Sequence, residues 1–166
     1  GSDGRTDGTA VRVFYDKSNI YLFWDVNEPD GITADANKPD MVPTGDDYVQ
    51  INIRPYLPDG IMYGRDYYYL ITVNPNGTVF DSYFEPYMGG HFYSSWDCGA
   101  KAAVFREGDR WSVEMIIPFA GLDVSSDPQW RWSLDFWHCS RTAAGETVLS
   151  SPPVGVTVEQ GGMVRR

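Results

Sequence analysis

Apolar and polar residues alternate along most of this chain, and that two-residue period restricts the fold more than any other feature of the sequence. Successive side chains of a β-strand point to opposite faces, so the period indicates strands with one buried face. Segments with helical spacing longer than two turns are nearly absent. We therefore predict an all-β protein with strands at about 9–15, 19–27, 46–54, 67–74, 77–85, 99–106, 110–117 and 130–141, and a last short one near 154–159.

Short polar turns separate several of these strands. Asn74-Pro75-Asn76-Gly77 and Glu107-Gly108-Asp109 each join two alternating segments, which predicts antiparallel hairpins, and Asp16-Lys17-Ser18-Asn19 is a third connection. The segment from Pro118 to Leu122 predicts a single helical turn, because proline is tolerated at a first helical position. We therefore expect an antiparallel β-sandwich, with immunoglobulin-like or jelly-roll-like layers and one short helical turn.

The length of 166 residues fits one domain, and a chain of this size buries roughly 70% of its unfolded surface. We expect the domain to span 9–160. Residues 1–8 are expected to form a flexible leader, whose first two residues, Gly1 and Ser2, resemble a protease-cleavage scar. Residues 161–166 are expected to form a flexible tail.

The formal net charge is −10, from 23 acidic and 13 basic residues. This charge repels phosphate backbones and anionic lipid headgroups, so we expect neither nucleic acid nor a membrane as partner. No apolar run approaches the ~20 residues of a membrane helix, and no signal peptide is recognisable. We expect a monomeric module of a larger chain, secreted or held at the cell surface, with its sequence starting downstream of an export signal.

The alternation assigns each strand a buried face and an opposite face. The predicted core positions are Val49, Ile51, Ile53, Tyr69, Ile71, Val73, Trp111, Val113, Met115, Trp132, Leu134, Phe136 and His138. The opposite positions are Tyr48, Gln50, Asn52, Arg54, Tyr68, Thr72, Asn74, Lys101, Glu114, Arg131, Ser133, Asp135, Trp137, Cys139 and Arg141.

Trp137 is the anomaly among these opposite positions, because a large aromatic side chain stands between Asp135 and Arg141. An aromatic ring flanked by hydrogen-bonding groups is the type of platform on which a sugar ring stacks. The alternative is that Trp137 packs under a loop.

Three segments occur in the order typical of family 9-like carbohydrate-binding modules: YYYLITVNPNGTVFDSYF, WDCGAKAAVFREGDRWSVEMIIPFAGL, and WRWSLDFWHCSR followed by SSPP. The most specific parts are VNPNG with a following aspartate, Asp81, and W-x-x-E-x-x-I-P-F, here Trp111 to Phe119. Over about residues 9–158 the chain therefore resembles these modules, members of a DOMON-like β-sandwich superfamily.

The resemblance implies a β-sandwich that accompanies secreted polysaccharide-degrading enzymes and holds a sugar end between aromatic side chains on a concave sheet. The matching strand positions here are Gln50, Glu114, Asp135, the neighbourhood of Trp137, and Arg141. Our hypothesis is that Trp137 stacks on the sugar, with Gln50, Asn52, Glu114, Asp135, Lys101 and Arg141 bonding to its hydroxyls. Candidates for a second aromatic wall are Tyr48, Tyr68, Tyr87, Tyr93 and Trp96.

Two further features leave alternatives open. Cys98 and Cys139 either form a disulfide or are two buried thiols. Asp and Asn residues cluster at 25–47, which makes a structural calcium ion an option, although the spacing matches no EF-hand-like loop and a solvated acidic loop is favoured. No cofactor is expected to be required, and Met88 and His91 are favoured as packing residues over haem ligands.

The rival functions are an enzyme and a spacer or protein-docking module. An enzyme would depend on a carboxylate pair such as Glu114 and Asp135, but acidic pairs on polar sheet faces are common and no nucleophile motif accompanies them. The spacer is the stronger rival, because a sandwich scaffold does not by itself specify function.

Overall fold

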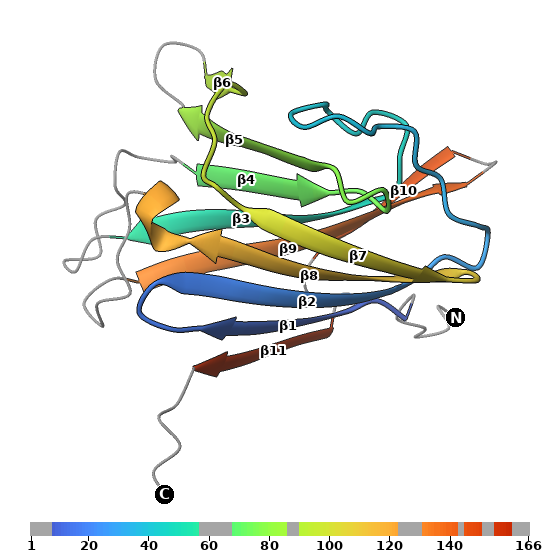
Figure 1. Cartoon of the computed structure of the whole chain (residues 1–166), viewed down its shortest axis with the longest axis horizontal. Helices are drawn as coiled ribbons and strands as arrows, with labels where there is room; N and C mark the ends of the chain where they lie inside the picture. The colour runs from blue at the N-terminus through green and yellow to red at the C-terminus, as the bar shows by residue number, and fades with distance from the viewer. Residues whose placement is uncertain are drawn as a thin grey trace, which may run out of the picture.

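The computed structural model describes residues 8–56, 68–85, 90–122, 131–142, 145–150 and 155–160. It is a two-sheet β-sandwich whose strands run roughly along the long axis of the molecule (Figure 1). The strands are β1 (Ala10–Tyr15), β2 (Asn19–Asn27), β3 (Tyr48–Tyr56), β4 (Tyr68–Val73), β5 (Val79–Glu85), β6 (His91–Tyr93), β7 (Lys101–Glu107), β8 (Arg110–Pro118), β9 (Arg131–Thr142), β10 (Gly145–Ser150) and β11 (Gly155–Gln160).

The five-stranded sheet, called sheet A, has the order β11-β1-β2-β8-β7, and the six-stranded sheet, called sheet B, has the order β10-β9-β3-β4-β5-β6. All pairings are antiparallel except that of β1 with β11, which is parallel. The predicted fold class is confirmed. Within the described ranges no helix has the length and apolar character that crossing a membrane requires.

Local turn chemistry explains the predicted hairpins. The Asp16 carboxylate accepts hydrogen bonds from the backbone N–H groups of Ser18 (2.7 Å) and Asn19 (2.8 Å), which fixes the turn between β1 and β2. In the turn between β4 and β5, Gly77 has a φ of 79°, a conformation that glycine adopts without steric cost. The predicted helical turn is the 3₁₀ helix η2 (Phe119–Gly121).

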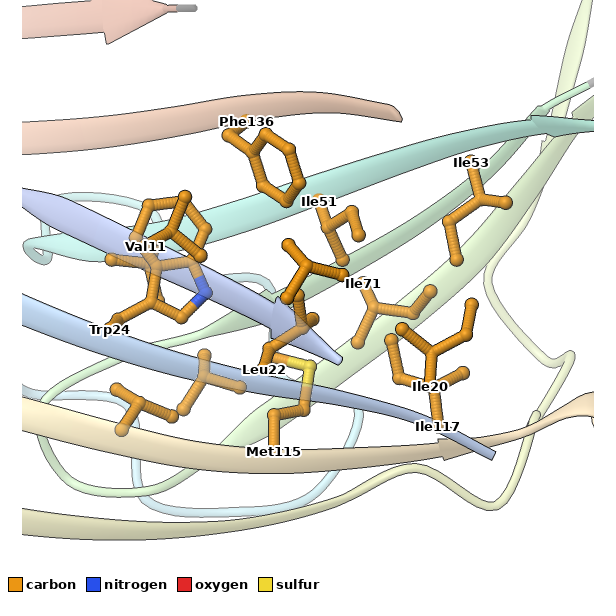
Figure 2. Packing of buried hydrophobic residues seen from close by; sticks show 14 of the residues in the cluster. Val11, Ile20, Leu22, Trp24, Ile51, Ile53, Ile71, Met115, Ile117 and Phe136 are labelled. Atoms are coloured by element: carbon orange, nitrogen blue, oxygen red, sulfur yellow. The ribbon is translucent and has the colours of Figure 1, made fainter. Parts of the chain in front are cut away.

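The hydrophobic core lies between the sheets. Figure 2 shows Leu22, Trp24 and Met115 from sheet A facing Ile51, Ile71 and Phe136 from sheet B. The predicted core positions are confirmed: all are buried except Trp132 and Leu134, which are partly buried and pack against the core.

Two strands were not predicted. β6 has three residues, His91–Tyr93, which is too short for a two-residue period to be recognised. β10 pairs antiparallel with β9. Of the predicted leader and tail, residues 1–7 and 161–166 lie outside the described ranges, so the domain boundaries stay predictions.

Candidate functional site

The outer face of sheet B gathers most of the predicted site residues. The strand register places Trp137, Gln50, Thr72 and Phe80 in one row across β9, β3, β4 and β5. A second row, one pleat along, contains Asp135, Asn52, Leu70 and Ser82. The sequence period assigned the face correctly, and the register then brought residues up to about 90 positions apart into one patch.

A groove with a volume of about 250 Å³ lies on this face, and we call it the sheet B groove. Gln50, Leu70 and Thr72 lie along it, together with three side chains that project beside them, Tyr48, Phe80 and Arg141. Val42, Pro43 and Thr44 border it from the loop between β2 and β3. The groove therefore combines apolar surface with amide, hydroxyl and guanidinium groups.

The loop beside the groove is held by buried polar contacts. The Asp46 carboxylate accepts hydrogen bonds from the backbone N–H groups of Asp35 (2.9 Å) and Ala36 (3.0 Å) and from Asn74 Nδ2 (2.7 Å). Asn74 Nδ2 also donates to the Ala36 carbonyl oxygen (2.8 Å). Asn74 is fully buried, so the predicted turn motif anchors the loop as well as forming a hairpin.

Asp47 ties the same loop to the end of β9. Its carboxylate accepts hydrogen bonds from the backbone N–H groups of Thr33 (2.5 Å) and Arg141 (2.6 Å). Burial raises the pKa of Asp47 above its ordinary value, while these two bonds oppose the rise. Arg141 Nε also lies 3.4 Å from the Asp46 carbonyl oxygen, so the backbone and side chain of Arg141 are positioned at the end of the groove.

The polar side chains along the groove form a short chain of hydrogen bonds. Thr72 Oγ1 donates to Gln50 Oε1 (3.2 Å), and Gln50 Nε2 donates to Asn52 Oδ1 (3.0 Å). In this arrangement Gln50 Oε1 is the acceptor and Gln50 Nε2 the donor. Thr72 and Asn52 are buried, and Gln50 is partly exposed. Gln50 is therefore the member of this chain that a ligand in the groove can reach.

Trp137 lies on the outer face as predicted and is partly exposed. Its Nε1 is buried and has no hydrogen-bond partner. The indole therefore offers an exposed part of its ring for stacking rather than a donor to a sugar hydroxyl.

Asp135 has a partner that the site hypothesis did not include. Arg54 Nη1 forms an ion pair with Asp135 Oδ2 at 2.7 Å, and the Arg54 guanidinium lies 5.4 Å from the centre of the Tyr68 ring. Burial raises the pKa of Tyr68 above its ordinary value, and the nearby Arg54 charge offsets only part of that rise. The alternation had already placed Arg54 on the same face as Asp135, so the sequence contained a signal for this ion pair. The predicted acceptor Asp135 is already engaged by a cation.

The candidate aromatic walls divide between two sides of sheet B. Tyr48 and Tyr68 lie on the outer face as predicted, and Tyr68 contacts Phe84 (5.1 Å between ring centroids). Trp96 instead stacks on the core residue Tyr69 (4.9 Å). Tyr93 stacks on Tyr83 (4.4 Å), on the same side of the sheet as Tyr69. Tyr87 lies outside the described residues.

Glu114 and Lys101 are not part of this patch, which corrects the single-site hypothesis. Glu114 lies on β8 and Lys101 on β7, and both project from the outer face of sheet A. A two-residue period separates core from solvent but does not say which of two outer faces a side chain occupies. The carboxylate pair considered for catalysis, Glu114 and Asp135, is accordingly divided between opposite sides of the sandwich.

In the structure the cysteines are two buried free thiols, which is one of the two alternatives left open by the sequence. Cys98 lies in the loop before β7, whereas Cys139 lies on β9 opposite Tyr48. The backbone N–H of Cys98 donates to Asp81 Oδ2 (2.8 Å). Burial and the Asp81 carboxylate raise the pKa of the Cys98 thiol far above its ordinary value, so this thiol is protonated at neutral pH.

The acidic loop shows no calcium site in the described part of the chain, where no three His, Cys, Asp or Glu side chains are grouped to hold a metal ion. Asp46 and Asp47 accept backbone hydrogen bonds instead. The calcium option stays a prediction.

A buried polar network near the start of this loop was not predicted. Glu28 Oε1 lies 2.6 Å from His138 Nε2, and Glu28 Oε2 accepts a hydrogen bond from Ser140 Oγ (2.6 Å). His138 Nδ1 lies 3.0 Å from Thr9 Oγ1. Glu28 and His138 are each 1% exposed, so the network joins β9 to the segments flanking β1 and β2 within the protein interior.

Comparison with solved structures shows which proteins share this fold. A candidate carbohydrate-binding protein from Bacteroides uniformis aligns with a TM-score of 0.67 at 17% identity, over 91% of this chain and 78% of that one. A family 9 carbohydrate-binding module from Caldicellulosiruptor kristjanssonii aligns in its glucose complex (TM-score 0.53, 11% identity, 95% of this chain, 81% of that one). Its cellotriose complex aligns similarly (TM-score 0.55, 12% identity, 96% and 80%).

No family model matches the sequence, and no curated protein matches it. At these identities the likeness establishes a common fold, and function has to be argued from the site itself.

Proposed function

We propose that this chain is a non-catalytic carbohydrate-binding module that holds an oligosaccharide or a polysaccharide segment on the outer face of sheet B. The observation that carries the proposal is the sheet B groove, where Gln50 and Arg141 lie beside Phe80 and Tyr48. Trp137 stands next to Gln50 in the adjacent strand. Small-molecule sites combine apolar surface with a few placed polar groups in this way.

A pyranose ring has one face of C–H groups and a rim of hydroxyls, and the groove together with the neighbouring Trp137 offers a counterpart to each. The exposed part of the Trp137 ring and the Phe80 ring supply apolar surface for the C–H face. Gln50 and Arg141 supply hydrogen-bond donors for the hydroxyls, and Gln50 Oε1 supplies an acceptor. The ligand thus contacts both ends of the row that runs from β9 to β5.

Asn52, Asp135 and Tyr68 extend this face in the direction away from Arg141. Because Asp135 is paired with Arg54, we propose that the pair forms part of the surface beside the sugar. Asp135 then does not act as an independent hydrogen-bond acceptor. Tyr68, with Phe84 beside it, is the second aromatic surface on this side of the groove. A longer ligand contacts this region as well.

The solved neighbours support the ligand class. The Caldicellulosiruptor kristjanssonii module, which shares the fold, was determined with glucose and with cellotriose. We further propose that this chain is part of a secreted, multimodular protein that degrades polysaccharides. The acidic net charge of −10 is compatible with a neutral glycan as ligand.

The experiment is a glycan-array and affinity-gel screen of the purified chain against plant, algal and host polysaccharides, with calcium and with a chelator. For the glycan that binds, Trp137→Ala is expected to weaken binding by on the order of 1–3 kcal/mol through lost stacking and apolar contact. Phe105→Ala is the matched control, because Phe105 is a highly exposed aromatic residue on sheet A. Equal affinity of wild type and Trp137→Ala would contradict the assigned site.

The alternative is a spacer or protein-docking module without glycan affinity. The mutual bonding of Gln50, Asn52 and Thr72 favours it, because polar groups that satisfy one another need no ligand. Absence of binding in both calcium and chelator would support this alternative.

A further inference from the structure

The outer face of sheet A carries a second, larger groove. Phe14, Tyr21, Ile116 and Lys101 form one row across β1, β2, β8 and β7, and Arg12, Phe23, Glu114 and Ala103 form the next. These two rows line a groove with a volume of about 400 Å³, which we call the sheet A groove. Pockets of roughly this size and larger hold small ligands.

The groove has an apolar floor at positions where an outer strand face is normally polar. Phe14 is 41% exposed and Ile116 is 44% exposed, and Tyr21 lies between them in the row. The Phe14 and Tyr21 rings are in contact, with centroids 5.5 Å apart. Apolar side chains that are exposed together in one row form a candidate interaction surface.

Charged groups surround this floor without being paired to described neighbours. The Arg12 guanidinium lies over the Phe23 ring at 5.5 Å. Neither Glu114 nor Lys101 makes an ion pair or side-chain hydrogen bond with any residue that the structure describes. Nearby on the same face, Asp25 and Arg110 do pair, at 2.9 Å. Donors and an acceptor are therefore available in the groove itself.

We propose that the sheet A groove is a second saccharide-binding surface, on the opposite side of the sandwich from the first. The inference rests on the proposed function only for its class of ligand. Phe14, Tyr21 and Phe23 provide ring surface for a pyranose, while Arg12, Glu114 and Lys101 bond to its hydroxyls. A purely apolar occupant is disfavoured, because covering Glu114 without a hydrogen-bonding partner is costly.

Two surfaces on opposite sides let one domain contact two glycan segments. The second contact then occurs at the effective concentration that the first contact sets, so the affinity for an insoluble polysaccharide exceeds that for a short oligosaccharide. Glu114 and Lys101 were predicted to bond to a sugar beside Trp137. In this proposal they bond to a sugar on the outer face of sheet A instead.

The test is NMR titration of the ¹⁵N-labelled chain with cellotriose, xylotriose and mannotriose, each at millimolar concentration. We expect at least one trisaccharide to shift backbone amides of β1, β2 and β8, and to do so in Trp137→Ala as well. Phe14→Ala and Glu114→Gln are each expected to weaken these shifts about fivefold or more in apparent affinity. Phe105→Ala, on the same sheet outside the groove, is the control and is expected to bind as wild type does.

The outcomes separate the two sites. Shifts confined to sheet B would overturn the second surface and leave the proposed function in place. Shifts confined to sheet A would support the second surface and refute the site on sheet B. No shift on either sheet would overturn the second surface, and the polysaccharide screen would then decide the proposed function by itself. Sheet A amides that shift with protein concentration, and not with sugar, would also overturn the inference, in favour of pairing between two copies of the chain.

Discussion

The two outer faces of the sandwich arise from the same alternation but use their polar groups differently. On sheet B, Gln50 bonds to its neighbours and Asp135 pairs with Arg54. On sheet A, Glu114 and Lys101 stand beside exposed aromatic rings with no described partner. Sheet B is bordered by a long anchored loop, so its side chains are partly sheltered and must satisfy one another, whereas side chains on the open face of sheet A rely on water.

Releasing the loop from sheet B is expected to have the largest effect on this contrast. Asn74→Ala removes the Nδ2 donor to Ala36 and Asp46, and it leaves the backbone N–H groups of Asn76 and Thr78 without the Oδ1 acceptor that they share. We expect a loss of about 2–3 kcal/mol in the free energy of unfolding, measured in urea, since a buried polar group without its bond costs about 1–3 kcal/mol.

Saccharide binding on sheet B is expected to fall in the same variant while binding on sheet A is retained. Asn37→Ala, an exposed asparagine in the same loop, is the control. If sheet B keeps full affinity in Asn74→Ala, the anchored loop does not shape the groove.

The pH dependence of the free energy of unfolding distinguishes a buried carboxylate from an exposed one. Burial raises the pKa of Asp81, on β5 of sheet B, above its ordinary value of 3.8. The folded chain therefore holds the Asp81 proton to higher pH than the unfolded chain does, and this residue's contribution to stability falls as pH rises from the ordinary value through the folded one. Asp81→Asn keeps an acceptor for the Cys98 N–H and removes that fall.

We expect Asp81→Asn to gain stability relative to wild type as pH rises from 3.5 to 7. The free energy of unfolding in urea, measured at each pH, tests this. Glu114→Gln, which removes an exposed carboxylate on sheet A, should stay within about 0.5 kcal/mol of wild type at pH 7. A parallel pH dependence for Asp81→Asn and wild type would argue against the burial of this charge.

The smallest effect is expected from the Arg54 and Asp135 pair, whose side chains are each about one-third exposed. Arg54→Ala should cost less than about 1 kcal/mol in urea unfolding, as partly exposed ion pairs do. It leaves Asp135 as an unpaired acceptor and so makes sheet B more like sheet A. We expect the affinity of sheet B for the bound glycan to change measurably in Arg54→Ala. In Arg12→Ala, which removes an arginine from sheet A, we expect the affinity of sheet B to stay the same.

Much of this fold could be predicted because its signals are local. The alternation identified nine of the eleven strands that the structure describes, and the turns at Asn74 and Asp16 marked the ends of two hairpins. The site was harder, because it depends on which strands become neighbours. Gln50 and Trp137 were placed on one face correctly, but Glu114 carries the same pattern and belongs to the other sheet.

Two further points that the sequence left open or did not reveal have similar causes. Cys98 and Cys139 carry no local mark of whether their side chains meet. The bond of His138 to Glu28 joins residues 110 positions apart, and each looks ordinary in its own segment. Long-range contacts of this kind depend on strand order, which the period of the sequence does not encode.

The parallel pairing of β1 with β11 has a mechanical consequence. Its register runs from Ala10 opposite Gly155 to Tyr15 opposite Gln160. Tension applied between the beginning of β1 and the end of β11 pulls these two strands along their length, so their interstrand hydrogen bonds share the force and must rupture together rather than one after another. A domain loaded in this direction resists extension at its edge before tension reaches the core between the sheets.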